Sequence, residues 1–418
     1  MRPMYRLYKY KEAFSADLIE YLVSRYAVKS PVLDCFAGAG TTLFSCADLG
    51  LSADGVEILP VGKICFEGRQ ELRRASKKTI NALQPWKSRV MWEKFPASQL
   101  NTLRISANAY PPQTVVDIGK FMNALMHASP SIQKILRFAL ICVLESVSYT
   151  RKDGQFLRWD NRSGRNLKSI FNKGHIAPFA SAISQKIEDM TKDSAGAEGI
   201  FASPNNNNDA KCNLYAGSCL DIMPSLPSGK YNTVITSPPY CNRYDYTRTY
   251  ALELALLGTT EAQLSALRQS MISCTVENKR KNLFGFNKQW ESAARIAEIN
   301  PLLIEITEYL KKMKELKALN NGGIPRMVEE YFREMACVIW ECWRVLAPGG
   351  KMIMVNDNVR YGGIDISVDL ILSDIAKQIG FDVAEILVLP RGKGNSSQQM
   401  GKFGRSELRK CVYCWEKT

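Results

Sequence analysis

The chain has 418 residues, 46% of them hydrophobic, which is enough to bury the core of one elaborated domain or two. Its 55 Lys and Arg residues exceed its 41 Asp and Glu residues, and the net charge of +14 favours a polyanionic partner over an acidic small molecule. The longest apolar stretch, residues 138 to 147, is far too short to cross a bilayer, so we expect no membrane span.

A glycine turn follows the first predicted strand. Residues 31 to 42 read as an apolar strand, a turn, and the opening of a helix that continues to residue 49. Gly38 and Gly40 allow the backbone to pass close to a ligand, and the helix N-terminus offers unpaired N–H groups to polar ligand atoms. Because position 43 is Leu, the full Gly-x-Gly-x-x-Gly of pyrophosphate binders is incomplete, and a dinucleotide is disfavoured.

The next predicted strand, residues 53 to 57, ends in an acid. Glu57 follows Gly40 by 17 residues, near the spacing at which nucleotide-binding folds place a carboxylate on ribose hydroxyls. The alternative is a solvated acid at a strand end.

Residues 75 to 211 contain two stretches with helical periodicity, at 115 to 126 and from about 132 to 148. Residues 149 to 162 then interleave aromatics with cations in a loop-like segment, and residues 151 to 173 carry seven basic and two acidic residues. This mixture suits contacts to a nucleic-acid backbone and to base edges, unless it is a solvated loop with Trp159 packed on the helices. The candidate DNA contacts in this segment are Arg151, Lys152, Arg158, Trp159 and Arg162.

A short apolar strand beginning at residue 234 runs into Ser237-Pro238-Pro239-Tyr240. Prolines cannot donate backbone hydrogen bonds and hold φ near about −65°, so the carbonyls of Ser237 and Pro238 are free and aimed. An exocyclic amino group that donates its hydrogens to such acceptors has its lone pair drawn out of conjugation and can attack an electrophilic methyl. Tyr240 would stack on the base. The alternative is a strand that ends in a polyproline turn, with Tyr240 a half-buried aromatic.

The pattern Asp34-x-Phe36-x-Gly38-x-Gly40-Thr41 together with Ser237-Pro238-Pro239-Tyr240 resembles the S-adenosylmethionine-dependent DNA amino-methyltransferases. The Ser-Pro-Pro-Tyr form resembles their cytosine N4 branch. The resemblance implies an α/β fold, the class I methyltransferase (Rossmann-like) seven-stranded mixed sheet with mainly helical insertions that form a target-recognition region. It also implies S-adenosyl-L-methionine as cofactor and double-stranded DNA as partner.

The resemblance covers about 1 to 74 and 212 to 418, with two interruptions. It divides the chain into a cofactor-binding part of the core (1–74), a helical insertion for target recognition (75–211), the core with the active-site motif (212–257), a second insertion with DNA contacts (258–326) and the C-terminal core strands (327–418). Residues 346 to 355 read as the turn and fifth strand of the sheet, and residues 381 to 389 and 410 to 415 as its last, antiparallel pair.

The resemblance also implies roles for individual residues. The catalytic residues are Ser237, Pro238, Pro239 and Tyr240. The cofactor-binding residues are Phe14 (from a loose N-terminal match), Asp34, Phe36, Ala37, Gly38, Gly40, Thr41, Thr42, Glu57, Cys219 and Asp221, of which Asp221 would meet the adenine amino group.

Further DNA contacts are expected beyond the active-site motif. Arg243, Tyr246 and Arg248 follow the motif and would line the base pocket or hold phosphates, although Tyr246 and Arg248 suit core packing of the next helix equally well. Lys279 and Arg280 belong to the second insertion, and Ser397 and Gln398 to a long polar loop.

Twelve cysteines at scattered spacing, with no signal peptide at the start, indicate reduced thiols in a cytosolic compartment. Cys411 and Cys414 form the only Cys-x-x-Cys, inside a predicted strand. With no second cysteine pair and two histidines in the chain, no metal site is expected.

The implied reaction is direct methyl transfer to the N4 amino group of a cytosine flipped out of duplex DNA, without a covalent adduct. Such enzymes belong to restriction-modification systems of prokaryotes, in which a cognate endonuclease would be a separate protein. One departure favours an alternative: the glycine turn precedes the Ser-Pro-Pro-Tyr motif, an order commoner among adenine N6 enzymes. RNA methylation, protein-amine methylation and a non-catalytic nucleic-acid-binding subunit also stay open.

Overall fold

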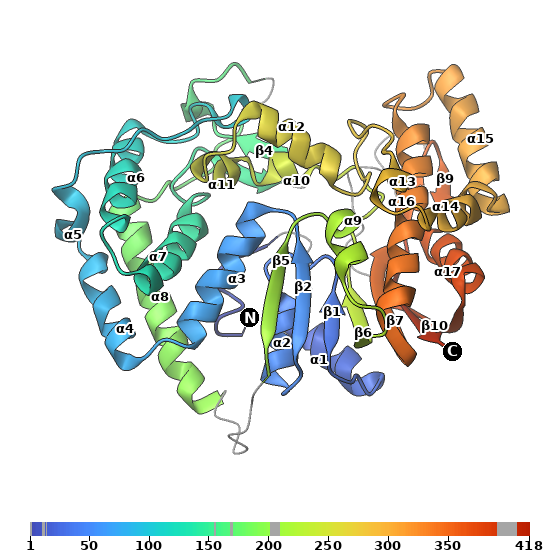
Figure 1. Ribbon diagram of the computed structural model, residues 1–418. Coiled ribbons are helices and arrows are strands. Elements are labelled where there is room, and N and C mark those ends of the chain that lie inside the picture. The colour runs from blue at the N-terminus through green and yellow to red at the C-terminus, as the bar shows by residue number, and fades with distance from the viewer. Residues whose placement is uncertain are drawn as a thin grey trace.

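The computed structural model describes residues 2–10, 13, 15–153, 156–167, 170–200, 210–390 and 408–418, with side chains in the helix at 179–200 described as far as residue 194. A central sheet carries helices on both faces, and further helices extend beyond its β5 edge (Figure 1). The strands of this sheet are β1 (Val32–Asp34), β2 (Ala53–Glu57), β5 (Cys212–Ala216), β6 (Tyr231–Thr236), β7 (Leu346–Asp357), β10 (Phe381–Val388) and β11 (Lys410–Lys417).

The strand order is β10-β11-β7-β6-β1-β2-β5. Neighbours from β5 to β7 pair in parallel, whereas β11 is antiparallel to both β7 and β10. A parallel sheet with one reversed strand near its edge is the expected class I methyltransferase sheet, and the prediction of an antiparallel pair at the C-terminus is confirmed. The order reverses between β1 and β6, which is where open α/β sheets bind ligands at the carboxyl ends of their strands.

Seventeen α-helices and four short 3-10 helices lie in the described part of the chain. The α-helices are α1 (Ala16–Arg25), α2 (Thr41–Asp48), α3 (Pro60–Arg73), α4 (Lys77–Leu83), α5 (Val90–Glu93), α6 (Pro112–Leu125), α7 (Pro130–Val143), α8 (Phe179–Ile200), α9 (Cys219–Ile222), α10 (Tyr246–Thr249), α11 (Ala251–Leu256), α12 (Glu261–Ser270), α13 (Leu283–Phe286), α14 (Trp290–Glu298), α15 (Pro301–Glu315), α16 (Ile324–Val345) and α17 (Val368–Ile379). The 3-10 helices are η1 (Gln84–Lys87), η2 (Arg104–Ser106), η3 (Asn161–Ser163) and η4 (Met223–Ser225).

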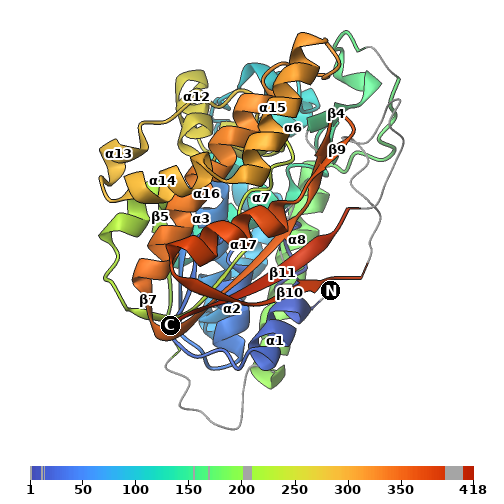
Figure 2. The ribbon, with the colours of Figure 1, turned by 90° about the vertical axis from the view of Figure 1, so that its right-hand side faces the viewer.

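The sheet is buried on both faces because successive side chains of a strand point to opposite sides. In β7, Met352 and Met354 join the core under α16 and α17, while Ile353 and Val355 join the core under α1 and α2. Figure 2 views the sheet from its β10 edge, with α17 lying along β10, β11 and β7. This two-sided burial explains why the strands read as apolar runs.

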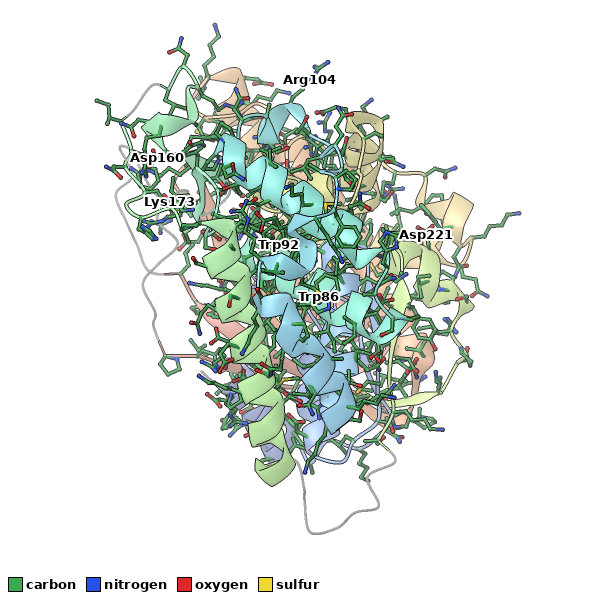
Figure 3. All side chains as sticks on the ribbon, turned by 90° about the vertical axis from the view of Figure 1, so that its left-hand side faces the viewer. Trp86, Trp92, Arg104, Asp160, Lys173 and Asp221 are labelled. Atoms are coloured by element: carbon green, nitrogen blue, oxygen red, sulfur yellow. The ribbon has the colours of Figure 1, made fainter. Side chains whose placement is uncertain are left out.

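The first insertion has a core of its own. The rings of Trp92, Phe121 and Phe179 meet edge to face, with Trp86 beside Phe121. Figure 3 shows Trp86 and Trp92 among the helices of this layer. The two helices expected here are present as α6 and α7, although α7 ends at Val143, earlier than the periodicity suggested.

The segment expected to be a loop after α7 is instead a β-ribbon. Strands β3 (Thr150–Asp153) and β4 (Phe156–Trp159) pair antiparallel, with Arg151 opposite Arg158 and Lys152 opposite Leu157. The sequence does not show the alternation of apolar and polar residues that is typical of a strand. Charged residues lie on the exposed face, and a lysine lies on the buried face as well. A second ribbon joins β8 (Val359–Tyr361) to β9 (Ile364–Ile366).

No helix in the described ranges combines the length and the apolar character that a membrane crossing requires. All twelve cysteines are free thiols, and Cys411 and Cys414 lie buried in β11.

Candidate active site

The glycine turn between β1 and α2 has the backbone that its sequence suggests. Gly38 and Gly40 have φ of 54° and 80°, in the left-handed region that favours glycine. Gly40 is the N-cap of α2. A Cβ atom at Gly38 would lie 3.2 Å from the ring of Tyr10, so the turn passes close beneath this aromatic side chain.

Asp34 joins the glycine turn to the strand that carries the second motif. Its Oδ1 accepts hydrogen bonds from the N–H of Phe36 at 3.0 Å and from the hydroxyl of Thr236 at 2.7 Å. Thr236 immediately precedes Ser237. Burial raises the pKa of Asp34, while these hydrogen bonds act in the opposite direction. Asp34 therefore fixes the relative position of the carboxyl ends of β1 and β6.

Glu57 closes the turn from the end of β2. Its Oε2 accepts from the N–H of Gly38 at 2.7 Å, and its Oε1 accepts from the N–H of Leu59 at 2.6 Å. The side chain is buried, and this burial raises the pKa of Glu57 to about 7, against the lowering effect of the backbone hydrogen bonds. Each carboxylate oxygen still has a lone pair for a ligand hydroxyl.

The Ser-Pro-Pro-Tyr motif leaves the end of β6 at the same edge of the sheet. The Ser237 hydroxyl donates to the hydroxyl of Tyr240 at 3.2 Å. The Tyr240 ring is buried, and Lys410 Nζ lies 5.9 Å from its centroid. Among the described residues, none donates a hydrogen bond to the carbonyls of Ser237 and Pro238.

A cavity lies between the glycine turn and the Ser-Pro-Pro-Tyr motif, with about 780 Å³ of empty space that includes its opening to solvent. It is lined by Tyr10, Ala13, Asp34, Cys35, Phe36, Ala37, Gly38, Thr41, Thr42, Val56, Glu57, Ile58, Leu59, Gly217, Ser218, Cys219, Ser237, Pro239, Tyr246, Met271 and Ile272. The structure thus brings together most of the candidate cofactor residues with Ser237 and Pro239.

Several lining residues carried no clear signal in the sequence. Tyr10 belongs to a segment whose match to the family is loose, and it stacks on Tyr250 with ring centroids 4.9 Å apart. Met271 and Ile272 follow α12 in the second insertion, and only the tertiary fold brings them over the cavity. Tyr246, considered earlier as a DNA contact or a core residue, also lies on the cavity wall.

Four candidates lie near the cavity without lining it: Gly40, Pro238, Tyr240 and Asp221. Asp221 is exposed on α9 and lines a neighbouring hollow together with Ser218 and Lys281. Figure 3 shows Asp221 on the side of that view away from Asp160. Phe14, Ser397 and Gln398 fall outside the described residues.

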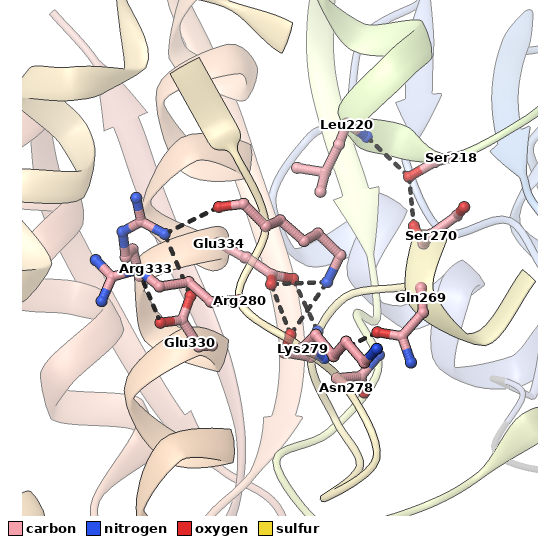
Figure 4. A network of polar contacts seen from close by, with 12 residues as sticks. Ser218, Leu220, Gln269, Ser270, Asn278, Lys279, Arg280, Glu330, Arg333 and Glu334 are labelled. Carbon is pink, nitrogen blue, oxygen red and sulfur yellow. Dashed lines mark hydrogen bonds and ion pairs between the residues drawn. The ribbon is translucent and has the colours of Figure 1, made fainter. Parts of the chain in front are cut away.

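The wall between the two hollows belongs to a polar network (Figure 4). The Ser218 hydroxyl donates to the carbonyl of Ser270 at 2.8 Å, which ties the loop before α9 to the end of α12. Lys281 forms an ion pair with the fully buried Glu334 at 2.7 Å. The second insertion is thereby anchored to α16 beside the cavity.

The ribbon separates the candidate DNA contacts of the first insertion by face. Arg151 and Arg158 project to solvent, whereas Lys152 is buried and forms an ion pair with Glu253. The Lys152 ammonium also donates to the hydroxyl of Tyr8 at 3.1 Å. Lys152 therefore holds the ribbon to the rest of the protein, and its charge does not reach the surface.

Trp159 and Arg162 each contact a neighbouring side chain of the first insertion. The Arg165 guanidinium lies 4.0 Å from the Trp159 ring centroid. Arg162 forms two hydrogen bonds with Asp160, and this pairing lowers the pKa of Asp160. Figure 3 places Asp160 and Lys173 together at one upper edge of the molecule.

The basic candidates that follow the active-site motif are exposed or half-buried, and most are paired. Arg243 donates to Asn320 at 2.9 Å, and Arg248 forms ion pairs with Asp245 and Glu277. Arg280 lies 3.5 Å from both Glu298 and Glu330, and the side chain of Lys279 is exposed.

Comparison with known proteins finds relatives that are all Type II methyltransferases. The chain is 51% identical over 421 residues to the Type II methyltransferase M.AvaI of Nostoc sp. and of Anabaena variabilis, a match that covers 100% of this chain and 87% of each relative. It is 37% identical over 444 residues to the Type II methyltransferase M.BsoBI of Geobacillus stearothermophilus, with 98% and 84% covered. No protein-family model matches the chain.

Proposed function

The chain belongs to the type II methyltransferases, and from this we propose that it methylates the exocyclic N4 amino group of a cytosine flipped out of duplex DNA. Site-specific DNA methylation within restriction-modification is the activity of this family, and S-adenosyl-L-methionine is the methyl donor. The observation that carries the N4 assignment is the position of Ser237 and Pro239 on the wall of the cavity that also holds Glu57 and the glycine turn.

The residues of the cavity fit this cofactor. Glu57 offers a buried carboxylate to ribose hydroxyls, and its bond to the N–H of Gly38 holds the glycine turn on the cavity wall. The side chains of Val56, Met271 and Ile272 supply apolar contact for a purine ring. When bound, the cofactor supplies an electrophilic methyl group.

The chain's own contribution is to localise the amine lone pair and to orient the base. The Ser237 hydroxyl and the proline-flanked carbonyls accept the hydrogens of the amino group, which directs its lone pair toward the cavity. Tyr240 offers a ring on which the base stacks. Positioning of this kind accounts for most of the rate enhancement, because the amino nitrogen attacks without a covalent intermediate.

We assign the DNA contacts to both insertions. In the first insertion, Arg151, Arg158 and Arg162 are exposed on or beside the ribbon. In the second, Lys279 and Arg280 are exposed. A cognate restriction endonuclease would be a separate protein. Methylation by the type II methyltransferase would protect the DNA against cleavage by that endonuclease.

Adenine N6 methylation is the second candidate, and one observation favours it. The strand that carries the glycine turn, β1, precedes the strand that carries Ser237, β6, in the chain. We favour cytosine N4 because the Ser-Pro-Pro-Tyr motif is the part expected to contact the base, whereas the order of the motifs reflects only a permutation of the chain.

Mass spectrometry of nucleosides tests both candidates. Duplex DNA is incubated with S-adenosylmethionine and either the unaltered protein or the variant that combines Ser237→Ala with Tyr240→Ala. N4-methylcytosine that disappears with this variant supports the proposal, and N6-methyladenine would replace it with the second candidate.

A matched control combines Ser225→Ala with Tyr21→Ala. Both residues are exposed, and neither lines the cavity. This variant should methylate DNA as the unaltered protein does. If no base is methylated by any of the proteins, the substrate is not duplex DNA and the proposal fails.

A further inference from the structure

The outer face of the β3–β4 ribbon holds two arginines whose positive charges repel each other unless a negatively charged or electronegative partner binds there. Arg151 and Arg158 lie directly opposite each other across the two strands. Like charges in this relationship destabilise a sheet. Both guanidinium groups also lie over the ring of Phe171, at 5.5 Å and 4.3 Å from its centroid.

The ring of Phe171 preorganises this pair. Phe171 is buried, and its carbonyl accepts from the N–H of Asn161 at 3.0 Å, so the ring is fixed beneath the arginines. Stacking on an aromatic face restricts the guanidinium planes, which lowers the entropy lost when they bind a planar acceptor.

Acidic neighbours do not neutralise the outer face. Arg158 has one exposed ion pair, with Asp153 at 3.4 Å, and such a pair contributes little in water. Arg151 has no ion pair among the described residues. The ribbon thus presents concentrated positive charge to an electronegative partner.

The ribbon is fixed relative to the cavity through its inner face. Lys152 pairs with Glu253 of α11, and β4 packs against α10, whose Tyr246 lines the cavity. In Figure 1, β4 lies above the carboxyl ends of the parallel strands, near α10. A duplex that places one base in the cavity would therefore bring neighbouring base pairs to the outer face of the ribbon.

These observations together favour one occupant. A two-stranded ribbon fits the major groove of B-form DNA, and arginine is the side chain that reads the O6 and N7 atoms of guanine with two hydrogen bonds. The exposed ring of Phe156 lies on the same face and adds apolar contact with a base edge or a thymine methyl.

We propose that the β3–β4 ribbon enters the major groove beside the target cytosine, and that Arg151 and Arg158 determine specificity by reading guanine within the recognition sequence. The proposal rests on DNA methylation as the function. It assigns sequence readout to a ribbon within the mainly helical insertion, and it excludes Lys152 from that readout.

The test uses a library of duplexes with random sequence, followed by sequencing that reports methylated positions. The decisive variant combines Arg151→Lys with Arg158→Lys, which keeps both charges but removes the paired donors that recognise guanine. We expect discrimination at one or two guanine positions to fall about 10- to 100-fold, with thermal stability and cofactor affinity unchanged.

A control that combines Lys77→Ala with Lys78→Ala removes two exposed charges from α4, at the far end of the first insertion in Figure 1. It should leave the methylated sequence unchanged. If the variant with both arginines changed to lysine retains the full selectivity of the unaltered protein, with or without a general loss of DNA affinity, the arginines do not read guanine and the proposal is wrong. Failure of the unaltered protein to methylate any duplex would instead remove the proposed function, and this outcome is seen before variants are compared.

Discussion

The carboxylate of Glu57 accepts a hydrogen bond from the backbone N–H of Gly38 at 2.7 Å. The end of one strand thereby fixes the turn that follows its neighbour, and both lie on the wall of the same cavity. Burial raises the pKa of Glu57 to about 7, so this carboxyl changes its charge near neutral pH.

The affinity for S-adenosylmethionine should depend on pH through Glu57. The ionised carboxylate accepts ribose hydroxyls, whereas the protonated form has lost part of its acceptor capacity. Because the free protein becomes protonated below its pKa, the affinity should weaken as the pH falls below about 7, by up to about tenfold per pH unit. Isothermal titration calorimetry between pH 5.5 and pH 8.5, chosen to span about 1.5 units on either side of that pKa, measures this dependence.

The control is Glu57→Gln, which retains the shape of the side chain but cannot ionise. Its affinity should be lower and should not vary over this range. An unaltered pH dependence in this variant would assign the titration to another group.

Gly62 lies in α3 where this helix packs closely against the glycine turn at Gly38. A Cβ atom at this position would lie 2.5 Å from both the Gly38 carbonyl and the Cγ of Glu57. Gly62→Ala should therefore displace the turn and weaken cofactor binding by about tenfold or more, because overpacking of this kind typically costs about 1–3 kcal/mol.

Equilibrium dialysis with labelled cofactor measures the effect of Gly62→Ala. Gly322→Ala is the matched control, since its Cβ would meet only the Lys314 side chain at 3.5 Å or more. Equal affinities for the two variants would show that the turn tolerates displacement.

The sheet could be predicted from sequence because its strands are short apolar runs, and several of them end in a recognisable motif or an acidic residue. Residues 53 to 57 and 381 to 389 match β2 and β10 within one residue. The spacing of Glu57 after Gly40 predicted a ligand-binding carboxylate, and the structure places Glu57 beside the glycine turn because parallel neighbouring strands bring their carboxyl ends to one edge of the sheet.

The ribbon could not be predicted in the same way. Arg151 and Lys152 are adjacent cations in the sequence, yet strand alternation sends one to solvent and the other into the protein. The partner that permits burial of Lys152 is Glu253, 101 residues away. Met271 and Ile272 were missed for a related reason, because long-range packing brings ordinary apolar residues over the cavity.

Removing one partner of the buried Lys152–Glu253 ion pair should destabilise the fold strongly. Lys152→Met leaves the Glu253 carboxylate buried without its cation, and breaking a buried ion pair by removing one partner costs about 3–5 kcal/mol. Thermal unfolding followed by circular dichroism should show a marked fall in the midpoint. Combining Lys152→Met with Glu253→Gln removes both charges and should recover much of the loss.

The same substitutions separate a structural role from DNA contact. The double variant should bind duplex DNA with the affinity of the unaltered protein once it is folded, because the charge of Lys152 does not reach the surface. A large and specific loss of DNA affinity in the folded double variant would contradict this assignment.

Tyr240 is expected to act mainly through its ring. Tyr240→Phe removes the hydroxyl that accepts from Ser237 at 3.2 Å but keeps the stacking surface, so methylation should fall by no more than about tenfold. Tyr240→Ala removes the ring, and base stacking on an aromatic side chain contributes about 1–3 kcal/mol. With the added loss of orientation, single-turnover methylation should fall by about 100-fold or more, while cofactor affinity should stay close to normal because the ring does not line the cavity. If Tyr240→Phe were as inactive as Tyr240→Ala, the hydroxyl and its bond to Ser237 would carry the role instead.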